Sequence, residues 1–160
     1  MTTTYTLLED LATEIELAVG DADITCVVDR VTVTAGEYAP LSNCNAVYLW
    51  ASTLADENEF DPVACNVRGR ITLNYRVSVC YTEEADDQTD VEHAVPAQCL
   101  YGLIDAIWCH LVRLRDSKDL LGCDCTDAKV GPIAVGPRQG GVVTADGTVT
   151  VPYDCPLITS

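Results

Sequence analysis

Cysteine is the residue type in this sequence whose number and spacing most suggest chemistry, as a metal ligand, in a disulfide or as a free thiol. Nine cysteines are spread over the chain, at positions 26, 44, 65, 80, 99, 109, 123, 125 and 155. The most metal-like pattern is Cys123-Asp-Cys125, after which only Cys155 follows. Structural zinc sites separate paired cysteines by roughly two to four residues and need a second pair of ligands. We therefore expect no metal, while a disulfide at Cys123 or Cys125 and free thiols both remain open.

The redox state of the other cysteines follows from where the chain is expected to fold. The sequence begins Met1-Thr-Thr-Thr-Tyr5, with neither the basic residues nor the apolar core of a secretory signal. Folding in a cytoplasm favours reduced thiols, and oxidation after release from the cell stays open. Cys26, Cys80 and Cys99 lie in regular elements and are interpreted as small core residues.

The two histidines, His93 and His110, stand in no arrangement that is typical of a catalytic base. The sequence contains no Gly-x-Ser-x-Gly or His-Glu-x-x-His motif. The glycine-rich segment Gly136-Pro-Arg-Gln-Gly-Gly141 lacks the Lys-Ser/Thr of a phosphate loop. We predict no catalytic residue, no cofactor and a protein that is not an enzyme. The alternative is a small thiol- or zinc-dependent enzyme built on Cys123, Cys125, Cys155 and His110.

Cations are scarce, with 25 acidic residues against 9 basic ones and a net charge of −16. Two of the cations, Arg70 and Arg76, fall on the polar side of one expected strand. We expect them to meet carboxylates at a subunit interface, supplied by the acidic loops 56–62 or 82–92 of this or a neighbouring copy. A solvated sheet face is the alternative.

The same charge balance limits the partners of the chain. A strongly acidic surface repels phosphate backbones, so specific DNA binding is not expected. Such a surface still suits DNA that must slide past without sticking. No run of apolar residues approaches the roughly 20 needed to cross a bilayer, so no membrane partner is expected.

The element around which the chain is organised is a long strand, Gly69 to Tyr81. Its alternate residues are apolar over the whole length: Ile71, Leu73, Tyr75, Val77, Val79 and Tyr81. This period of two predicts a strand with one buried face. A long apolar helix, Ala97 to Arg115, follows and begins next to Pro96. Strand and helix together are expected to supply most of one core.

That helix is apolar nearly all round. Its core stripe consists of Leu100, Leu103, Ile104, Ile107, Leu111 and Leu114, widened by Tyr101, Trp108 and Val112. The opposite side carries Gly102, Ala106, Cys109 and Arg113. A helix that is apolar on several sides is buried on several sides. A second subunit is expected to cover this small-residue strip, with the N-terminal helix of the same chain as the alternative.

The other elements complete a single domain. We expect a helix at 5–19, capped by Thr3, Thr4 or Thr6, and strands at 24–34, 46–55, 129–135 and 142–153. A hairpin turn is predicted at Asp146-Gly147. The acidic segment 56–62 is expected to be a loop, with Phe60, the chain's only Phe, as an anchor for a partner.

These elements predict an α+β fold in which a mixed, mostly antiparallel sheet is flanked by two main helices. One domain is expected to span residues 1–160. Residues 122–160 are expected to form a C-terminal strand and hairpin extension of the same domain.

Several short motifs follow one another along the chain in a recognisable order. They are Val33-Thr-Ala-Gly36, Asn43-Cys-Asn45, Phe60-Asp-Pro62, Leu73-Asn-Tyr-Arg-Val-Ser-Val-Cys80, Ala106-Ile-Trp-Cys109, Val130-Gly-Pro-Ile133 and the glycine-rich segment that ends at Gly141. Their order and spacing, from about residue 5 to 155, resemble the small neck proteins of long-tailed phages of actinobacteria, in particular tail terminator proteins.

The resemblance implies a tail-terminator-like fold and a structural virion protein that assembles in the host cytoplasm. It implies a homo-oligomeric, hexameric ring that caps the tail tube protein and docks head-side connector or stopper proteins, with DNA passing through its channel. Another neck or tail-tube component is the nearest alternative. The resemblance supplies no catalytic residues and no role for the cysteines.

Overall fold

The computed structural model describes residues 3–21, 26–37, 45–61, 66–81, 90–117, 119–122 and 128–156 of the chain. Residues 21, 56–61, 66–68, 90–94, 122 and 154–156 are described by their backbone alone. In chain order the elements are α1 (Thr4–Asp21), β1 (Arg30–Val33), β2 (Ala46–Asp61), β3 (Asn66–Cys80), α2 (Asp90–Asp116), the 3-10 turn η1 (Leu120–Gly122), β4 (Lys129–Val130), β5 (Ala134–Val135) and β6 (Val142–Pro156).

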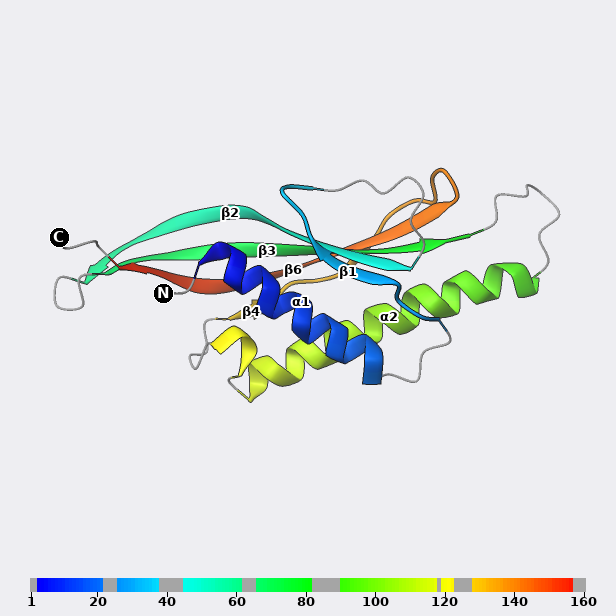
Figure 1. Cartoon of the computed structure of the whole chain (residues 1–160), viewed down its shortest axis with the longest axis horizontal. Helices are drawn as coiled ribbons and strands as arrows, with labels where there is room; N and C mark the ends of the chain where they lie inside the picture. Colours follow the sequence, from blue (N-terminus) through cyan, green and yellow to red (C-terminus); the bar gives the residue numbers. More distant parts are fainter. Residues whose placement is uncertain are drawn as a thin grey trace.

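The strands form one mixed sheet in the order β1-β2-β3-β6-β4, with β5 also paired to β6. β1 runs parallel to β2, and the remaining pairs are antiparallel. The expected α+β class and the mixed, mostly antiparallel sheet are therefore confirmed. β2, β3 and β6 are much longer than the other strands and give the molecule its elongated shape (Figure 1).

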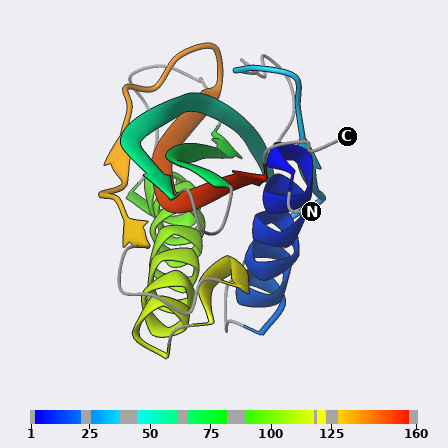
Figure 2. The same ribbon diagram turned by 90° about the vertical axis from the view of Figure 1, so that its left-hand side faces the viewer.

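β3 lies at the centre of the sheet, as its alternation predicts. It pairs along its whole length with β6, from Asn66 opposite Pro156 to Cys80 opposite Val142. Both main helices lie side by side on the same face of the sheet (Figure 2). The side chains of β3 that face them are almost completely buried: Ile71, Leu73, Tyr75, Val77 and Val79. Every second side chain of the central strand thus points to the face of the sheet that the helices cover.

The core between the sheet and the helices is built from apolar residues of both. α1 contributes Leu7, Leu8, Leu11, Ala12, Ile15 and Ala18, and α2 contributes Leu100, Leu103, Ile107 and Leu111. Ile104 and Leu114 are only partly buried against this core. The predicted leucine stripe of the long helix is therefore the core stripe. Leu120, in η1, closes the core after α2 ends.

Of the three threonines considered as a cap for α1, Thr3 performs this role. The backbone N–H of Thr6 donates to Thr3 Oγ1 at 3.1 Å, and the N–H of Leu7 donates to the Thr3 carbonyl at 3.0 Å. A side-chain oxygen at the N-cap satisfies an amide that has no partner inside the helix. The start of α1 is therefore fixed one residue before its first turn.

α2 begins at Asp90, several residues earlier than the sequence predicts, so Pro96 lies inside the helix and not at its start. Residues 90–92 of the predicted loop 82–92 are thus helical. Residues 82–89 lie outside the described part of the chain. Inside a helix, proline removes one backbone hydrogen bond and its ring clashes with the carbonyl four residues earlier, at a cost of about 3 kcal/mol. A helix of 27 residues tolerates that loss near its first turns.

The segment Val95–Asp116 of α2 is long and apolar enough to cross a membrane by length and composition alone. The expectation that no segment reaches that length was therefore wrong. In the folded chain, however, Leu103, Ile107 and Leu111 of this segment are completely buried in the core shared with the sheet and α1. One face packed on a sheet is typical of a helix of a globular domain. That the chain has no membrane partner stays a prediction.

The predicted acidic loop 56–62 is wrong for residues 56–61, which continue β2. They pair with β3, and the register places Glu59 opposite Arg68. The pairing shifts between Asp56 and Glu59, a β-bulge opposite Gly69. A Cβ on Gly69 would lie 2.6 Å from the carbonyl oxygen of Ala55, so the strands approach closely here.

The hairpin predicted at Asp146-Gly147 is also wrong, because β6 runs unbroken from Val142 to Pro156. Gly147 lies opposite Tyr75 of β3, and a Cβ on Gly147 would lie 2.3 Å from the Tyr75 ring. Asp146 pairs with Arg76 on the other face of the sheet. An Asp-Gly pair favours a turn locally, but here each residue is fixed in the strand by its neighbour on β3.

Two other strands are shorter than the sequence predicts. In place of a strand at 24–34, only Arg30–Val33 pairs with β2, and Val27 is 76% exposed; residues 22–25 lie outside the described part. In place of one strand at 129–135, β4 and β5 are separated by Gly131-Pro-Ile133. The proline interrupts the pairing because it has no N–H to donate.

The cysteines expected as reduced core residues are bonded. Cys26 and Cys99 form a disulfide that joins the segment before β1 to the core face of α2. Cys80, at the end of β3, is disulfide-bonded as well. Cys109 of α2 is free and exposed. The interpretation of Cys26, Cys80 and Cys99 as small reduced residues was therefore wrong.

Candidate subunit-contact site

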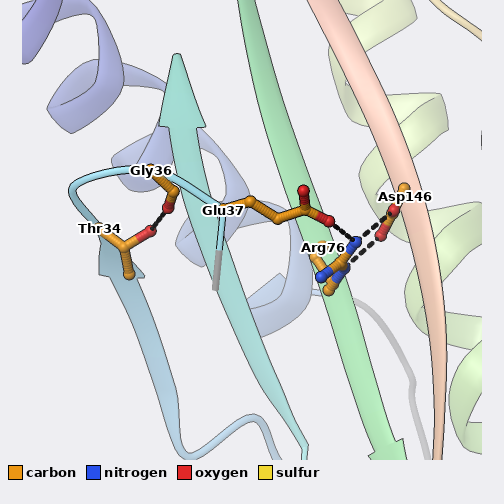
Figure 3. A network of polar contacts seen from close by, with 5 residues as sticks. All are labelled: Thr34, Gly36, Glu37, Arg76 and Asp146. Carbon is orange, nitrogen blue, oxygen red and sulfur yellow. Dashed lines mark hydrogen bonds and ion pairs between the residues drawn. The ribbon is translucent and has the colours of Figure 1, made fainter. Parts of the chain in front are cut away.

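Arg76 is the centre of a charged network on the sheet face opposite the helices (Figure 3). Its Nε donates to Asp146 Oδ1 at 2.7 Å, and its Nη2 donates to Asp146 Oδ2 at 2.8 Å and to Glu37 Oε1 at 2.6 Å. The guanidinium also lies 5.3 Å from the centre of the Trp50 ring, within cation–π range. A bidentate pair of this kind fixes the orientation of the guanidinium.

Strand register and a short turn position the two carboxylates. Asp146 is directly opposite Arg76 in the β3–β6 pairing. Glu37 follows a turn after β1, where Thr34 Oγ1 donates to the carbonyl of Gly36 at 2.7 Å and Gly36 has a φ of +97°. Glycine adopts such a φ without strain. The hydrogen bond to Asp146, more than that to Glu37, raises the pKa of Arg76 above its usual range, so it stays charged.

These contacts change the interpretation of the arginine pair. In the described part of the chain, Arg76 pairs with Asp146 and Glu37 of the same chain, and neither of these two belongs to the acidic segments 56–62 and 82–92. The side chain of Arg76 is only 13% exposed. Arg70, half-buried on β3, lies opposite Ala55 and Pro152 in the register. A role of either arginine in a subunit contact stays a prediction.

The small-residue strip of α2 is partly open. Gly102 and Ala106 are half-buried, whereas Cys109 and Arg113 are exposed. α1 packs beside α2, and Nε2 of His110 lies 2.7 Å from Glu14 Oε2 on α1. The N-terminal helix therefore lies along this side of α2 but leaves the outer half of the strip in solvent. That a second subunit covers the strip stays a prediction.

Three exposed apolar side chains of α2 and β5 were not predicted to form a site. Tyr101 is 54% exposed and Trp108 is 44% exposed on α2, and Val135 of β5 is 44% exposed. The signal was present in the sequence, because Tyr101 and Trp108 widen the leucine stripe beyond the width that one sheet covers. Exposed apolar side chains of this kind can contribute to a contact site where they lie together.

Beside Tyr101 lies a pocket with a volume of about 230 Å³, which we call the Tyr101 pocket. Its apolar walls include Leu100, Tyr101, Val135 and Val143, and at its edge Arg138 lies 4.9 Å from the centre of the Tyr81 ring. The amide of Gly136 donates to the carbonyl of Thr144 at 2.9 Å and holds the segment after β5 against β6. The pocket thus combines apolar walls with one cation.

Phe60, the expected anchor, lies on β2 opposite Val67 of β3, near the end where the two strands meet the 62–65 connection. It is part of an extension that we call the sheet arm: Asp56–Asp61 of β2, Asn66–Arg70 of β3 and Pro152–Pro156 of β6. The arm projects past the first turn of α1, beyond both main helices (Figure 1).

No group of three or more potential metal ligands occurs among the residues that the structure describes. Cys123 and Cys125, the most metal-like pair, lie outside those residues, and Cys155 and His93 are described by backbone only. His110 is engaged with Glu14. The absence of metal, cofactor and catalytic activity therefore stays a prediction.

The geometry defines an α+β protein with a long mixed sheet and two helices on one of its faces. No protein-family model matches the chain, and no curated protein matches it. Among solved structures, it is similar to the sheath/tube terminator of an extracellular contractile injection system, PVC, solved by cryo-EM in the extended state. The identity is 12% and the TM-score is 0.36.

That likeness covers 100% of this chain and 62% of the terminator chain, so this chain spans less than two thirds of the length of that protein. A TM-score of 0.36 describes a partial likeness. Neither the function nor the partners of this chain are taken from it.

Proposed function

We propose that this chain is a tail terminator, a structural virion protein that forms a hexameric ring, caps the tail tube of a long-tailed actinobacteriophage and joins it to the head-side neck. The ordered motifs from about residue 5 to 155 motivate the family. The observation that carries the proposal is the surface that a single copy leaves uncovered, at the sheet arm and along α2.

Both uncovered surfaces are unusual for a chain that acts alone. Tyr101 and Trp108 expose about half of their side chains on one helix, and large apolar side chains of this kind are enriched in the centres of protein interfaces. In the sheet arm, β2 beyond Leu49 and β6 beyond Val151 have no further strand on their outer sides in the described part. Open strand edges favour pairing with another chain.

The charge of the chain fits the proposed place in the virion. A net charge of −16 gives a ring channel that repels the phosphate backbone, so DNA passes without being held. The proposed partners are further copies of the chain, the tail tube protein and the connector or stopper proteins on the head side. The chain is assembled in the host cytoplasm and then resides in the virion.

The test of the ring is Ala106→Arg on the small-residue strip of α2. Ala106 is half-buried beside the exposed Cys109 and Arg113. We expect this variant to keep the circular dichroism of the wild type but to lose the ring in native mass spectrometry. Thr13→Arg, at an exposed position of α1, is the matched control and is expected to keep the ring. A folded Ala106→Arg variant that still forms rings removes the strip from the interface.

A different position in the same assembly is the nearest alternative. A connector, a stopper or a tube component would also form a ring around DNA, and only the location of the chain in the particle separates these roles. The alternative of a zinc enzyme built on Cys123, Cys125, Cys155 and His110 predicts a monomer that contains one equivalent of zinc. Metal analysis of the purified chain distinguishes it from the structural protein.

A further inference from the structure

β1 is a short outer strand of the described sheet, and the fold covers it only in part. Its four residues, Arg30–Val33, pair in parallel with Ala46–Leu49 of β2. Arg30 is exposed and the other three are half-buried, whereas the residues of β2 opposite them are all buried. Parallel pairing is also slightly less stable per residue than antiparallel pairing. Strand pairing and burial therefore hold β1 more weakly than the central strands.

β1 is anchored at both of its ends by contacts outside the strand pairing. After the strand, Glu37 pairs with Arg76 at 2.6 Å (Figure 3). The Glu37 side chain is 62% exposed, and ion pairs at the surface contribute little to stability. Before the strand, Cys26 is bonded to Cys99 of α2. The disulfide is therefore the stronger of these two anchors.

The surroundings of this disulfide suit a bond that opens and closes. Cys99 is buried in the core, whereas Cys26 is half-buried and lines a cavity of about 470 Å³. Val27 and Asp29, which also line the cavity, are exposed, so a small thiol can approach the Cys26 sulfur from solvent. Sγ of Cys99 lies 3.7 Å from Oδ1 of Asn45. A reduced Cys99 thiol therefore has an acceptor inside the core.

We propose that the Cys26–Cys99 disulfide is a redox latch, which holds β1 and the turn 34–37 in oxidising surroundings and releases them in reducing ones. To open it, a thiolate of a small dithiol attacks the Cys26 sulfur, and Cys99 leaves as a thiolate that takes up a proton. The second thiolate of the dithiol displaces Cys26, so the reductant leaves as a cyclic disulfide. To close it, a small disulfide such as oxidised glutathione takes up the two electrons and the two protons and becomes two thiols.

The latch explains how a disulfide fits a chain that is proposed to assemble in a host cytoplasm. Glutathione and thioredoxin keep thiols reduced there, so β1 is released while the chain assembles. The bond closes after the particle has left the cell. This timing rests on the proposed function, whereas the latch itself is a property of the isolated chain.

Pulsed hydrogen exchange of the full chain, measured by mass spectrometry, tests the latch. Without reductant, we expect the amides of β1 to be protected. With dithiothreitol, they should exchange within about threefold of the rate of an unstructured peptide, and the amides of β3 should remain at least about tenfold slower than those of β1. Unchanged protection of β1 overturns the latch. Equal loss of protection in β1 and β3 also overturns it, because the bond would then support the whole fold.

A variant must separate this bond from that of Cys80, which is disulfide-bonded as well. Cys26→Ser with Cys99→Ala removes the latch and keeps the bond of Cys80. Without reductant, its β1 amides should exchange within about threefold of those of the reduced wild type. Cys109→Ser, at a free and exposed cysteine, is the control and should respond to dithiothreitol as the wild type does. Protection of β1 that persists in the double variant until reductant is added overturns the latch.

Thiol labelling tests the timing. Cells that produce the phage, and particles released from them, are each denatured in N-ethylmaleimide, and the labelled peptides are identified by mass spectrometry. We expect Cys26 and Cys99 to carry the label in most copies inside cells and to be bonded in most copies in released particles. A bond already formed inside cells, or thiols in released particles, overturns the timing. Particles that lack the chain overturn the proposed function, and the hydrogen-exchange result still decides the latch.

Discussion

Tyr75 and Gly147 face each other across β3 and β6, and β6 runs unbroken past this pair. The Tyr75 side chain is completely buried, and its ring occupies the space that a side chain at position 147 would need. Glycine in a strand weakens it, and it marks a site where another group approaches closely. The Tyr75 ring therefore fits here because Gly147, the residue opposite, has no side chain.

Gly147→Ala tests this fit. The added Cβ would lie 2.3 Å from the Tyr75 ring, so we expect the free energy of unfolding to fall by about 1–3 kcal/mol, the usual cost of overpacking a core. Urea denaturation measures it. The control is Gly20→Ala on α1, where no atom lies within 4 Å of the new Cβ. This helical change is expected to raise stability by about 0.5–1 kcal/mol. Equal effects of the two changes would contradict the proposed fit.

The hydroxyl of Tyr75 is buried without a hydrogen-bond partner in the described part of the chain. Burial raises the pKa of the Tyr75 phenol above its usual range, because the charged form loses its hydration. Above the ordinary tyrosine pKa of about 10, the unfolded chain releases this proton and the folded chain keeps it. The stability that depends on Tyr75 is therefore complete below about pH 10 and falls as the pH rises.

Tyr75→Phe removes both effects. At neutral pH we expect its free energy of unfolding to equal or exceed that of the wild type by up to about 1 kcal/mol, because an unsatisfied buried hydroxyl is removed. Between about pH 9 and 11, stability should decline less steeply in the variant than in the wild type. Urea denaturation at a series of pH values measures both slopes, and parallel slopes would show that Tyr75 is not the titrating group.

At the scale of elements, the central strand and the long helix could be predicted from the sequence, and the contacts between distant segments could not. The alternation from Ile71 to Tyr81 and the leucine stripe of α2 are periodic, and periodic burial is local information. By contrast, residues 56–61 look like a loop from their charges and become a strand only through pairing with β3. The same holds for Asp146-Gly147, whose turn preference is overridden by Arg76 and Tyr75.

In the candidate site too, local features could be predicted from the sequence and contacts between distant segments could not. The sequence identified Arg76 as a cation that needs carboxylates and Phe60 as an isolated aromatic residue. It could not identify Asp146 and Glu37 as the partners of Arg76, because they are 70 and 39 residues away in sequence. It also could not place Arg138 beside Tyr81, since that contact depends on β6 pairing with β3 and on the segment after β5 lying against β6.

The Cys26–Cys99 disulfide connects two elements and yields a prediction about their stability. It joins residues 73 apart in sequence, and a loop of that length corresponds to about 4 kcal/mol of lost entropy in the unfolded chain. The double variant Cys26→Ser with Cys99→Ala should be less stable than the wild type by about this amount under oxidising conditions.

Under reducing conditions the difference between the two chains should largely disappear, because the wild type then also lacks the cross-link. Cys109→Ser is the matched control, since Cys109 is free and exposed, and it should not change stability. Thermal unfolding with and without dithiothreitol measures all three chains. A double variant as stable as the oxidised wild type would mean that this bond contributes nothing to stability.

At the scale of the whole molecule, charge and shape point to the same kind of role. The chain carries a net charge of −16, and we expect no submicromolar affinity for duplex DNA at physiological salt. Fluorescence anisotropy with a labelled duplex measures this. Tight binding would reveal a cationic surface that the composition does not suggest, and it would contradict a channel through which DNA passes freely.

The acidic molecule also has uncovered surfaces at both of its ends. The sheet arm lies at one end, and the N-terminal part of α2, which lines the Tyr101 pocket, lies at the other (Figure 1). The two helices cover one face of the sheet (Figure 2). In the proposed ring of identical copies, these two ends are the surfaces available for contacts between neighbours.

The most direct measurement of the proposed role is a cryo-EM reconstruction of phage tails assembled with this chain. The account predicts a single ring of six copies at the head-proximal end of each tail tube, and tubes of irregular length when the chain is left out. Copies of the chain along the whole tube, on the head-side connector alone, or absent from the particle would contradict it.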